Sequence, residues 1–202
     1  MNTPDIKEEL REKRLRRPTK EFLNMTPEKA YILGVLCGDG SISEKFIRLE
    51  IRNDEDFIKE FARCLKEVYG LNYNYKHYKK RDSLVLYASS EIICLDLLKY
   101  GRCGTFEWKI PAEIFNSPKE SISCGFLRGL FDSEGTANRY VVSMSSANEK
   151  GINQVNKLLN KLEIKNKIMK TKKGYYVLYI THKVMLKKFI EKIGFTIKRK
   201  LV

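Results

Sequence analysis

The spacing of apolar residues alternates along the chain between a period of two and a period near 3.6. In residues 46–52, Ile47, Leu49 and Ile51 alternate with charged side chains, which predicts a strand with one buried face. Residues 139–145 alternate similarly and predict a second strand of this kind. The later patterns predict helices over about 54–69 and 147–162, hairpins over about 72–89 and 165–181, and closing helices over about 91–100 and 182–193.

A further helix is predicted in front of each of the two strands. Thr26 is a favourable N-cap, and Pro27 suits the first helical position. Residues 117–120, Ser-Pro-Lys-Glu, have the spacing of a capping box. Because glycine commonly ends helices, we expect these two helices to end at Gly40 and Gly135.

Segments 30–40 and 125–135 resemble each other, and each places an acid, Asp39 or Glu134, just before a glycine. The predicted elements follow both segments in the same order, which indicates a duplication. The fold class is therefore expected to be α+β, with two pseudo-symmetric αββαββα subdomains, each carrying a four-stranded antiparallel sheet. We assign a basic N-terminal extension to residues 1–25 and the two subdomains to residues 26–116 and 117–202.

The 202 residues carry a formal net charge of +14, and this charge is unevenly distributed. Residues 150–202 hold 15 basic and two acidic side chains, whereas residues 26–149 are close to neutral. Such a density favours nucleic acid as the partner over an anionic membrane surface. A highly charged solvated surface, as in heat-adapted proteins, is the alternative. If the partner is DNA, we expect its binding to weaken steeply with salt and to depend mainly on the C-terminal half.

Membrane insertion and secretion are not expected. The longest nearly uninterrupted apolar run, residues 30–37, is too short to cross a bilayer, and the N-terminus is charged. The five cysteines form no Cys-x-x-Cys pair and their number is odd. We therefore interpret them as reduced thiols of a cytoplasmic protein.

Small residues lie four positions apart on one face of each of the two helices: Gly34 and Gly38 in the first, Gly129 and Ser133 in the second. Such residues let two helices pack backbone to backbone, which would bring Asp39 and Glu134 together. A divalent cation would relieve the repulsion between acids at two helix C-termini. Carboxylate oxygens without nearby His or Cys favour Mg²⁺, and this ion with a polyanionic ligand indicates phosphodiester hydrolysis.

Residues 33–40, Leu-Gly-Val-Leu-Cys-Gly-Asp-Gly, and residues 127–135, Leu-Arg-Gly-Leu-Phe-Asp-Ser-Glu-Gly, resemble the duplicated signature of LAGLIDADG homing endonucleases. The resemblance implies a monomer in which the two motif helices form the central interface and the two sheets straddle the major groove of double-stranded DNA. It also implies a site-specific endonuclease that cuts both strands at a long target and takes part in intron homing.

The resemblance further implies a set of catalytic residues. Asp39 and Glu134 would hold Mg²⁺ with the carbonyls of Gly38 and Ser133. Mn²⁺ would substitute for Mg²⁺, and Ca²⁺ would bind without supporting cleavage. Members often place one lysine from each half near the scissile phosphates, and the residues that match by position are Lys109 and Lys200.

A strand rises about 3.3 Å per residue, so two tandem sheets would cover roughly twenty base pairs. Polar side chains on the exposed faces of the predicted strands are expected to contact the bases. In the first half these are Arg48, Glu50, Arg52, Lys76, Tyr78, Lys80 and Tyr87. In the second half they are Arg139, Ser143, Ser145, Lys170, Lys172 and Tyr179.

Some alternatives stay open at this level. Residues 11–17 are basic and would add phosphate contacts, form a disordered arm, or pack as a helix. The resemblance also implies a polar or basic residue late in the first hairpin of each half, which falls near Arg52-Asn53 and Ser145-Ser146. The second copy offers no cation there, so one strand of DNA is expected to be cut faster than the other. The alternative function is a nucleic-acid-binding relative that does not cleave, such as an intron RNA maturase or a DNA-binding regulator.

Overall fold

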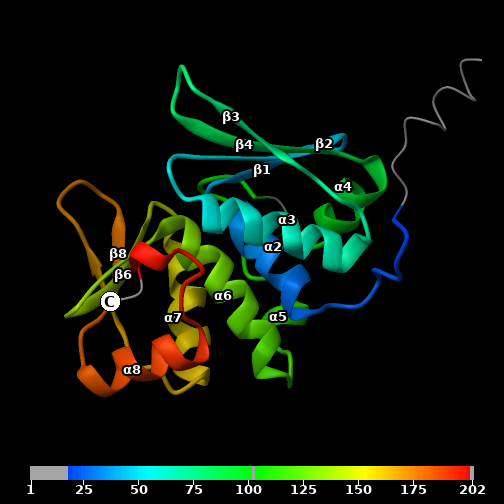
Figure 1. Cartoon of the computed structure of the whole chain (residues 1–202). Helices are drawn as coiled ribbons and strands as arrows, with labels where there is room; N and C mark the ends of the chain where they lie inside the picture. The colour runs from blue at the N-terminus through cyan, green and yellow to red at the C-terminus, as the bar shows by residue number, and fades with distance from the viewer. Residues whose placement is uncertain (1–17, 102, 201–202) are drawn as a thin grey trace, which may run out of the picture.

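The computed structural model describes residues 18–101 and 103–200, and Figure 1 shows how the two halves are arranged around a central pair of helices. The first half runs α2 (Pro27–Cys37), β1 (Gly40–Ile42), β2 (Phe46–Ile51), α3 (Glu55–Tyr69), β3 (Tyr75–Tyr78), β4 (Ser83–Ser89) and α4 (Glu91–Leu98). Its strands form one antiparallel sheet in the order β1-β2-β4-β3.

The second half repeats this order. It runs α6 (Glu120–Glu134), β5 (Gly135–Asn138), β6 (Val141–Ser146), α7 (Glu149–Lys161), β7 (Lys167–Lys170), β8 (Tyr176–Ile180) and α8 (Lys183–Lys192). Its sheet has the order β5-β6-β8-β7. The predicted α+β fold with two αββαββα units is therefore confirmed. Two short elements were not predicted, α5 (Ala112–Phe115) and the 3-10 helix η1 (Lys198–Lys200).

The two sheets also share their register. Arg48 of β2 lies opposite Tyr87 of β4, and Ser143 of β6 lies opposite Tyr179 of β8. In β2 the residues alternate between partly exposed and buried, as the apolar pattern predicts. Each sheet thus buries one face against helices and leaves the other face open.

The helix starts agree with the sequence in one half only. The Thr26 side chain accepts a hydrogen bond from the Lys29 amide (3.2 Å), so the predicted N-cap of α2 is confirmed. The predicted capping box is wrong, because α6 begins at Glu120 with Lys119 as its N-cap. The Ser117 hydroxyl instead accepts a hydrogen bond from the Lys119 amide (3.1 Å), and this local turn uses the group that would have capped the helix.

The helix ends differ in a related way. Helix α6 continues to Glu134 and ends at Gly135, as predicted, but α2 already ends at Cys37. Gly38 has non-helical backbone angles, and a Cβ at this position would lie 2.4 Å from Cβ of Ser133. The chain therefore leaves the first helix earlier than expected, and Asp39 stands in the turn after it.

Helices α2 and α6 pack side by side at the centre of the molecule (Figure 1). A Cβ on Gly34 would lie 2.2 Å from the carbonyl oxygen of Phe126, and a Cβ on Gly129 would lie 2.2 Å from that of Tyr31. These reciprocal approaches confirm the predicted two-helix interface. Only residues without a side chain allow the backbones to come this close.

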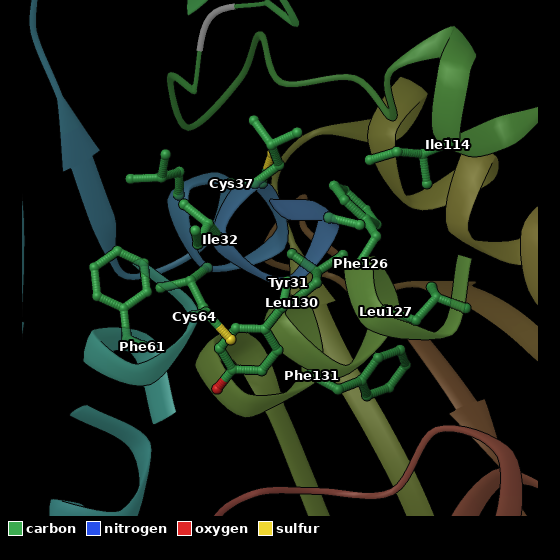
Figure 2. Packing of buried hydrophobic residues seen from close by; sticks show 14 of the residues in the cluster. Tyr31, Ile32, Cys37, Phe61, Cys64, Ile114, Phe126, Leu127, Leu130 and Phe131 are labelled. Carbon is green, nitrogen blue, oxygen red and sulfur yellow. The ribbon is translucent and has the colours of Figure 1, made fainter. Parts of the chain in front are cut away.

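The apolar core continues through both halves without a break. Figure 2 shows side chains of α2, such as Ile32, between Phe61 of α3 and Phe126 and Leu130 of α6. All four of these side chains are fully buried. The predicted division at residues 116 and 117 falls in the turn between α5 and α6.

The extension is described from Pro18 onward, and residues 11–17 lie outside the described residues. The Thr19 amide donates to the carbonyl of Tyr69 (2.9 Å), which attaches this segment to the end of α3. Nearby, the buried Lys29 ammonium pairs with Asp96 (2.6 Å) and also donates to the carbonyl of Phe22 (2.5 Å). Within the described part of the chain, no helix combines the length and apolar character that a bilayer span requires.

Candidate active site and DNA interface

A cavity of about 510 Å³, here called the Asp39 cavity, lies where the two motif helices end beside the first sheet. Asp39 reaches it from the turn after α2, and Asp132 and Ser133 reach it from the last turn of α6. Four cationic side chains complete its polar walls: Arg52, Arg81, Arg199 and Lys200. The other acids in its walls are Glu50 and Asp54. Four cations thus balance four acids in this cavity.

A second cavity of about 430 Å³, the Glu134 cavity, has walls from residues 103–108, from the end of β6 and from the residue that follows this strand. Glu134 lines it together with Cys37 and Gly38 from the end of the first motif helix. Among the described residues, Glu134 is the only charged side chain in its walls. Asp39 therefore shares its cavity with Ser133, which precedes Glu134. Glu134 shares its cavity with Gly38, which precedes Asp39.

Both motif acids are accessible to solvent at the rims of these cavities, but their surroundings disfavour ionisation. Partial burial raises the pKa of Asp39, while the charge of Lys200 opposes this rise. Partial burial also raises the pKa of Glu134, and the negative charge of Asp39 raises it further. The two acids consequently repel each other, which a bound cation would relieve.

The donor set fits a hard divalent cation. Among the described residues, no group of three or more Asp, Glu, His or Cys side chains could hold a metal ion. Asp39 and Glu134 would offer one carboxylate each, and other oxygen atoms would complete the coordination. Mg²⁺ is commonly bound in this way, because it keeps several waters and shares phosphate oxygens.

Lys200 is a buried member of the Asp39 cavity. Its ammonium group donates hydrogen bonds to the carbonyl oxygens of Asp132 (2.6 Å) and Phe131 (3.2 Å), which caps the last turn of α6. Burial lowers the pKa of Lys200, and the nearby charges of Asp132 and Asp39 oppose this change. The structure thus places this predicted residue beside Asp39.

Hydrogen bonds from both halves fix the C-terminal segment that carries Lys200. The buried carboxylate of Asp132 accepts bonds from the Tyr31 hydroxyl (2.8 Å) and the Thr196 amide (2.9 Å). Farther along, the guanidinium of Arg199 binds both carboxylate oxygens of Asp54 (2.8 and 2.7 Å). Sequence reasoning missed these contacts, and the only signal was Asp132, an acid at the position where the first motif has Cys37.

Lys109 occupies a different environment from Lys200. Its side chain is exposed and, among the described residues, it does not line the Glu134 cavity. Its two neighbours in the chain, Trp108 and Ile110, are buried. Their backbone groups are held by side chains: the carbonyl of Trp108 accepts a hydrogen bond from Asn148 (2.7 Å), and the amide of Ile110 donates one to Gln154 (2.9 Å). The two predicted lysines are therefore not equivalent in three dimensions.

The open face of the first sheet gathers most of the DNA contacts predicted for the first half. Arg48 and Glu50 lie on this face of β2 and form an ion pair with each other. Lys76 and Tyr78 of β3 and Tyr87 of β4 join them, because the antiparallel register aligns these positions. All of these side chains except Glu50 line a shallow groove on this face. Arginine and glutamate on a strand can read guanine and cytosine edges.

The open face of the second sheet is less charged than predicted. Ser143, Ser145 and Tyr179 lie on it as expected. Lys170 lies opposite the buried Tyr176, which puts it on the other face, so the parity chosen for β7 is wrong. Lys167, opposite Tyr179, is the lysine on the open face, and the poor alternation in this strand gave no signal for it.

The remaining predicted contacts lie outside the regular strands. Arg52 follows the end of β2 and lines the Asp39 cavity. Lys80 lies in the turn between β3 and β4, Arg139 in the turn between β5 and β6, and Lys172 in the turn between β7 and β8. These three side chains are exposed, and at sheet ends they suit phosphate contacts better than base contacts.

Family models match both halves of the chain. A model described as WhiA LAGLIDADG-like domain matches residues 28–101, and one described as LAGLIDADG-like domain matches residues 121–194. Each match includes one motif helix and the sheet that follows it. The duplication seen in the fold is thus also found by comparison with known families.

Solved structures of two kinds share this fold. A mesophilic variant of the homing endonuclease I-DmoI is 21% identical, with 83% of this chain and 95% of that chain covered and a TM-score of 0.63. A complex of I-DmoI with DNA and Mn is 20% identical, with 85% and 98% covered and a TM-score of 0.61. Full-length DUF199/WhiA from Thermatoga maritima is 18% identical, with 86% and 59% covered and a TM-score of 0.61.

Curated relatives contain a similar segment within longer proteins. The chain is 29% identical over 176 residues to the DNA-directed RNA polymerase subunit Rpo1C of Methanocaldococcus jannaschii, covering 84% of this chain. It is 30% identical over 185 residues to the probable translation initiation factor IF-2 of the same organism, again covering 84%. The chain spans only 20% and 15% of these two proteins.

Proposed function

Because the chain belongs to the LAGLIDADG family and carries two of its motifs, we propose that it is a site-specific endonuclease that binds double-stranded DNA as a monomer and hydrolyses both strands. The carrying observation is the pair of acids at the ends of two packed helices, each lining a cavity with the residue that precedes the other. The family fold is shared by the homing endonuclease I-DmoI and by WhiA, so the fold alone does not decide between cleavage and binding. Retention of both acids favours cleavage.

Divalent metal is part of this proposal. Asp39 and Glu134 would hold Mg²⁺, with the carbonyl of Ser133 near the first acid and that of Gly38 near the second. Bound metal would supply activation of water and stabilisation of the leaving oxygen. Solved structures of I-DmoI contain DNA with Mn, with Mg or with Ca. This supports a divalent ion and the predicted exchange of Mg²⁺ for Mn²⁺.

The protein's own side chains would orient the duplex. The two open sheet faces offer side chains to base edges, and lysines in the turns at their ends offer charge to phosphates. Lys200, held against the end of α6, would place a positive charge beside the phosphate that reacts in the Asp39 cavity. Developing charge on that phosphate would be stabilised without movement of the lysine.

We extend the proposal to homing of a mobile genetic element. The matched segments occur in proteins whose names describe a polymerase subunit, a translation factor and the ribonucleoside-diphosphate reductase subunit NrdEB of Bacillus subtilis. Each match spans 20% or less of the longer protein. Because proteins of such different function carry a similar segment, the matches support a segment that spreads independently of its host proteins. They do not indicate a role in the chemistry of those proteins. Intron homing, intron RNA as a partner and a cytoplasmic location remain predictions from the sequence.

The test begins with a randomised duplex library incubated with Mg²⁺, from which cleaved sequences are selected. Asp39→Asn and Glu134→Gln should each lose double-strand cleavage by a factor of about a hundred or more while keeping DNA affinity within a few-fold. Glu91→Gln, an exposed acid at the start of α4, is the matched control and should cut normally. Undiminished cutting by either motif variant would refute the assignment.

A DNA-binding protein that does not cleave is the second candidate, favoured by the match of residues 28–101 to the WhiA model. It predicts sequence-selective binding in a mobility-shift assay without products in Mg²⁺ or Mn²⁺. Such a result for the unmodified chain would replace the endonuclease proposal.

A further inference from the structure

A buried polar network at the centre of the molecule holds the segment that carries Lys200. The carboxylate of Asp132 is 1% exposed, and its two oxygens accept hydrogen bonds from the Tyr31 hydroxyl (2.8 Å) and the Thr196 amide (2.9 Å). The hydroxyl groups of Tyr31 and Thr196 also lie 3.5 Å apart. The backbone carbonyl of Asp132 accepts a hydrogen bond from the Lys200 ammonium (2.6 Å). One residue of α6 thus joins a side chain of the first half to the lysine of the Asp39 cavity.

Only three residues separate Thr196 from Lys200, and their path is fixed. The Lys200 amide donates to the carbonyl of Ile197 (2.9 Å), which closes the short helix η1. On the other side of Thr196, the Phe195 ring is buried, and its centroid lies 5.6 Å from the Lys200 ammonium. The position of Thr196 therefore determines where the ammonium group lies.

Tyr31 lies where the two halves come closest. A Cβ on Gly129 would lie 2.2 Å from the carbonyl oxygen of Tyr31, so the backbones of α2 and α6 touch at this residue. Its side chain is fully buried and crosses the interface to reach Asp132. Because a hydrogen bond weakens when its atoms move apart by a few tenths of an ångström, a shift of one motif helix against the other would break this contact. The packing of the halves therefore controls the hydrogen bonds of Asp132.

The first motif has different residues at the equivalent positions. When the motifs are aligned on their acids, Tyr31 corresponds to Phe126 and Asp132 to Cys37. Phe126 has no hydroxyl group, and the thiol of Cys37 is a weak hydrogen-bonding group. Lys109, the predicted lysine of that half, is exposed, whereas its counterpart is buried. The polar pair thus occurs with the lysine that is held in place.

Resting on the proposed function, we propose that Tyr31 and Asp132 are positioning residues of the endonuclease, which hold the Lys200 ammonium in the Asp39 cavity according to how the two halves pack. Tyr31 acts through Asp132 and Thr196, because its own side chain is buried. A cation that is already in place stabilises developing charge without reorganisation. Loss of a positioning group should therefore lower the rate of cleavage more than the affinity for DNA.

The experiment compares two buried tyrosines that make the same bond. Tyr31→Phe removes the hydroxyl bound to Asp132, which keeps its bond from the Thr196 amide. Tyr69→Phe removes a hydroxyl bound to Asp96 (2.9 Å), an acid of α4 that keeps its ion pair with a lysine. The second variant thus causes the same chemical loss between α3 and α4 of the first half.

Single-turnover cleavage of the selected duplex is measured in saturating Mg²⁺, and DNA affinity is measured without metal. Tyr31→Phe should slow cleavage about tenfold and keep affinity within twofold, whereas Tyr69→Phe should keep both within twofold. An unchanged rate for Tyr31→Phe, or equal slowing by the two variants, would overturn the positioning role and leave the endonuclease proposal standing. No cleavage by the unmodified chain would refute both.

A double-mutant cycle tests whether Tyr31 acts through the lysine. Lys200→Met alone should slow cleavage about a hundredfold, as the loss of one electrostatic donor commonly does. Adding Tyr31→Phe to it should slow cleavage by no more than another twofold, because no ammonium group is left to position. The same tenfold loss with and without Lys200 would show that Tyr31 acts independently of it, and would overturn the proposal.

Variants of Asp132 separate position from charge. Asp132→Asn keeps an oxygen that accepts from the Thr196 amide, and its new amide group can donate to the Tyr31 hydroxyl. It should slow cleavage less than about threefold, whereas Asp132→Ala, which leaves both partners unbound, should slow it about tenfold or more. Equal losses for the two variants would contradict a positioning role.

Hydrogen exchange in the free protein gives a readout without DNA or cleavage. Tyr31→Phe should speed exchange of the backbone amides in residues 196–200 several-fold, because the segment loses part of its attachment. Tyr69→Phe should leave exchange in this segment unchanged. Unchanged exchange for Tyr31→Phe would overturn the proposal even if the chain cleaves DNA.

Discussion

The open faces of the two sheets have the same backbone register but different side-chain chemistry. Arg48 and Glu50 of the first sheet correspond by register to Ser143 and Ser145 of the second. Lys76, opposite Val85, corresponds to Met169, opposite Val177. Charged groups in the N-terminal half are thus replaced by hydroxyl and thioether groups, although the C-terminal half carries nearly all of the net charge.

The excess positive charge of the C-terminal half lies mostly elsewhere. Exposed lysines such as Lys150, Lys157 and Lys187 belong to α7 and α8, and Lys165 lies just after α7. Helix α7 packs against β6, β7 and β8 with its apolar residues buried, whereas its lysines Lys150 and Lys157 are exposed on its other side. Net charge per half does not tell which face carries it, and the expectation that DNA affinity depends mainly on the C-terminal half stays a prediction.

The largest expected effect is on stability and concerns the interface between α2 and α6, where the two halves are alike. Gly34→Ala and Gly129→Ala each put a methyl group 2.2 Å from a backbone carbonyl oxygen of the facing helix. Each should lower the free energy of unfolding by about 3 kcal/mol, measured by chemical denaturation. Gly104→Ala, whose new methyl group would only touch Glu107 at 3.6 Å, is the control. Markedly unequal losses for the first two would show that the pseudo-symmetry of the helix pair is imperfect in energy.

The next effect concerns base recognition. Arg48→Ala should cost about 1–3 kcal/mol of binding to the selected target and relax base preference in the half-site under the first sheet. The register-equivalent Ser143→Ala should cost less than about 1 kcal/mol, because it removes one hydroxyl. Quantitative binding to libraries randomised in one half-site measures both changes. Equal relaxation of the two half-sites would contradict the contrast between the faces.

A smaller effect is expected on stability. The raised pKa of Glu134 means that its charged form is disfavoured in the folded protein, so ionisation costs stability at pH values above that pKa. Glu134→Gln should therefore raise the free energy of unfolding at pH 7 in EDTA, which is measured as a higher melting temperature. The gain should stay below about 1 kcal/mol because the group is partly solvated. The gain should shrink as the pH falls through the raised pKa, where the carboxyl is already neutral. A gain that is independent of pH would point to altered packing instead.

The smallest effect tests the lysines of α7. Lys150→Gln with Lys157→Gln should change DNA affinity less than about twofold and leave its salt dependence unaltered, because these side chains lie on the helical side. Lys167→Gln, on the open face, should lower the salt slope by about one. A comparable loss of slope for the α7 variant would mean that DNA wraps around the helical side.

The sequence predicted most of the fold because its signals are local. Alternation in residues 46–52 places the buried face of β2 correctly, and the small residues of the motifs predict the helix pair. Predictions failed where another interaction competed with the expected one or where the pattern was weak. The Ser117 hydroxyl bonds in a turn instead of capping α6, and strand β7 alternates too weakly to reveal that Lys167 and not Lys170 lies on the open face.

By itself the sequence determined that the chain is duplicated, and it predicted that two acids lie at the ends of paired helices and that a polyanion is the partner, because repeat, periodicity and charge are properties of the chain alone. Only the tertiary structure decided which groups surround each acid. Arg199 meets Asp54 across 145 residues, and Tyr31 meets Asp132 across 101. The first contact depends on how the C-terminal segment crosses to the other half and the second on how α2 packs against α6, and no local pattern encodes either arrangement. Although the two acids are equivalent in the motifs, the described residues that line their two cavities differ.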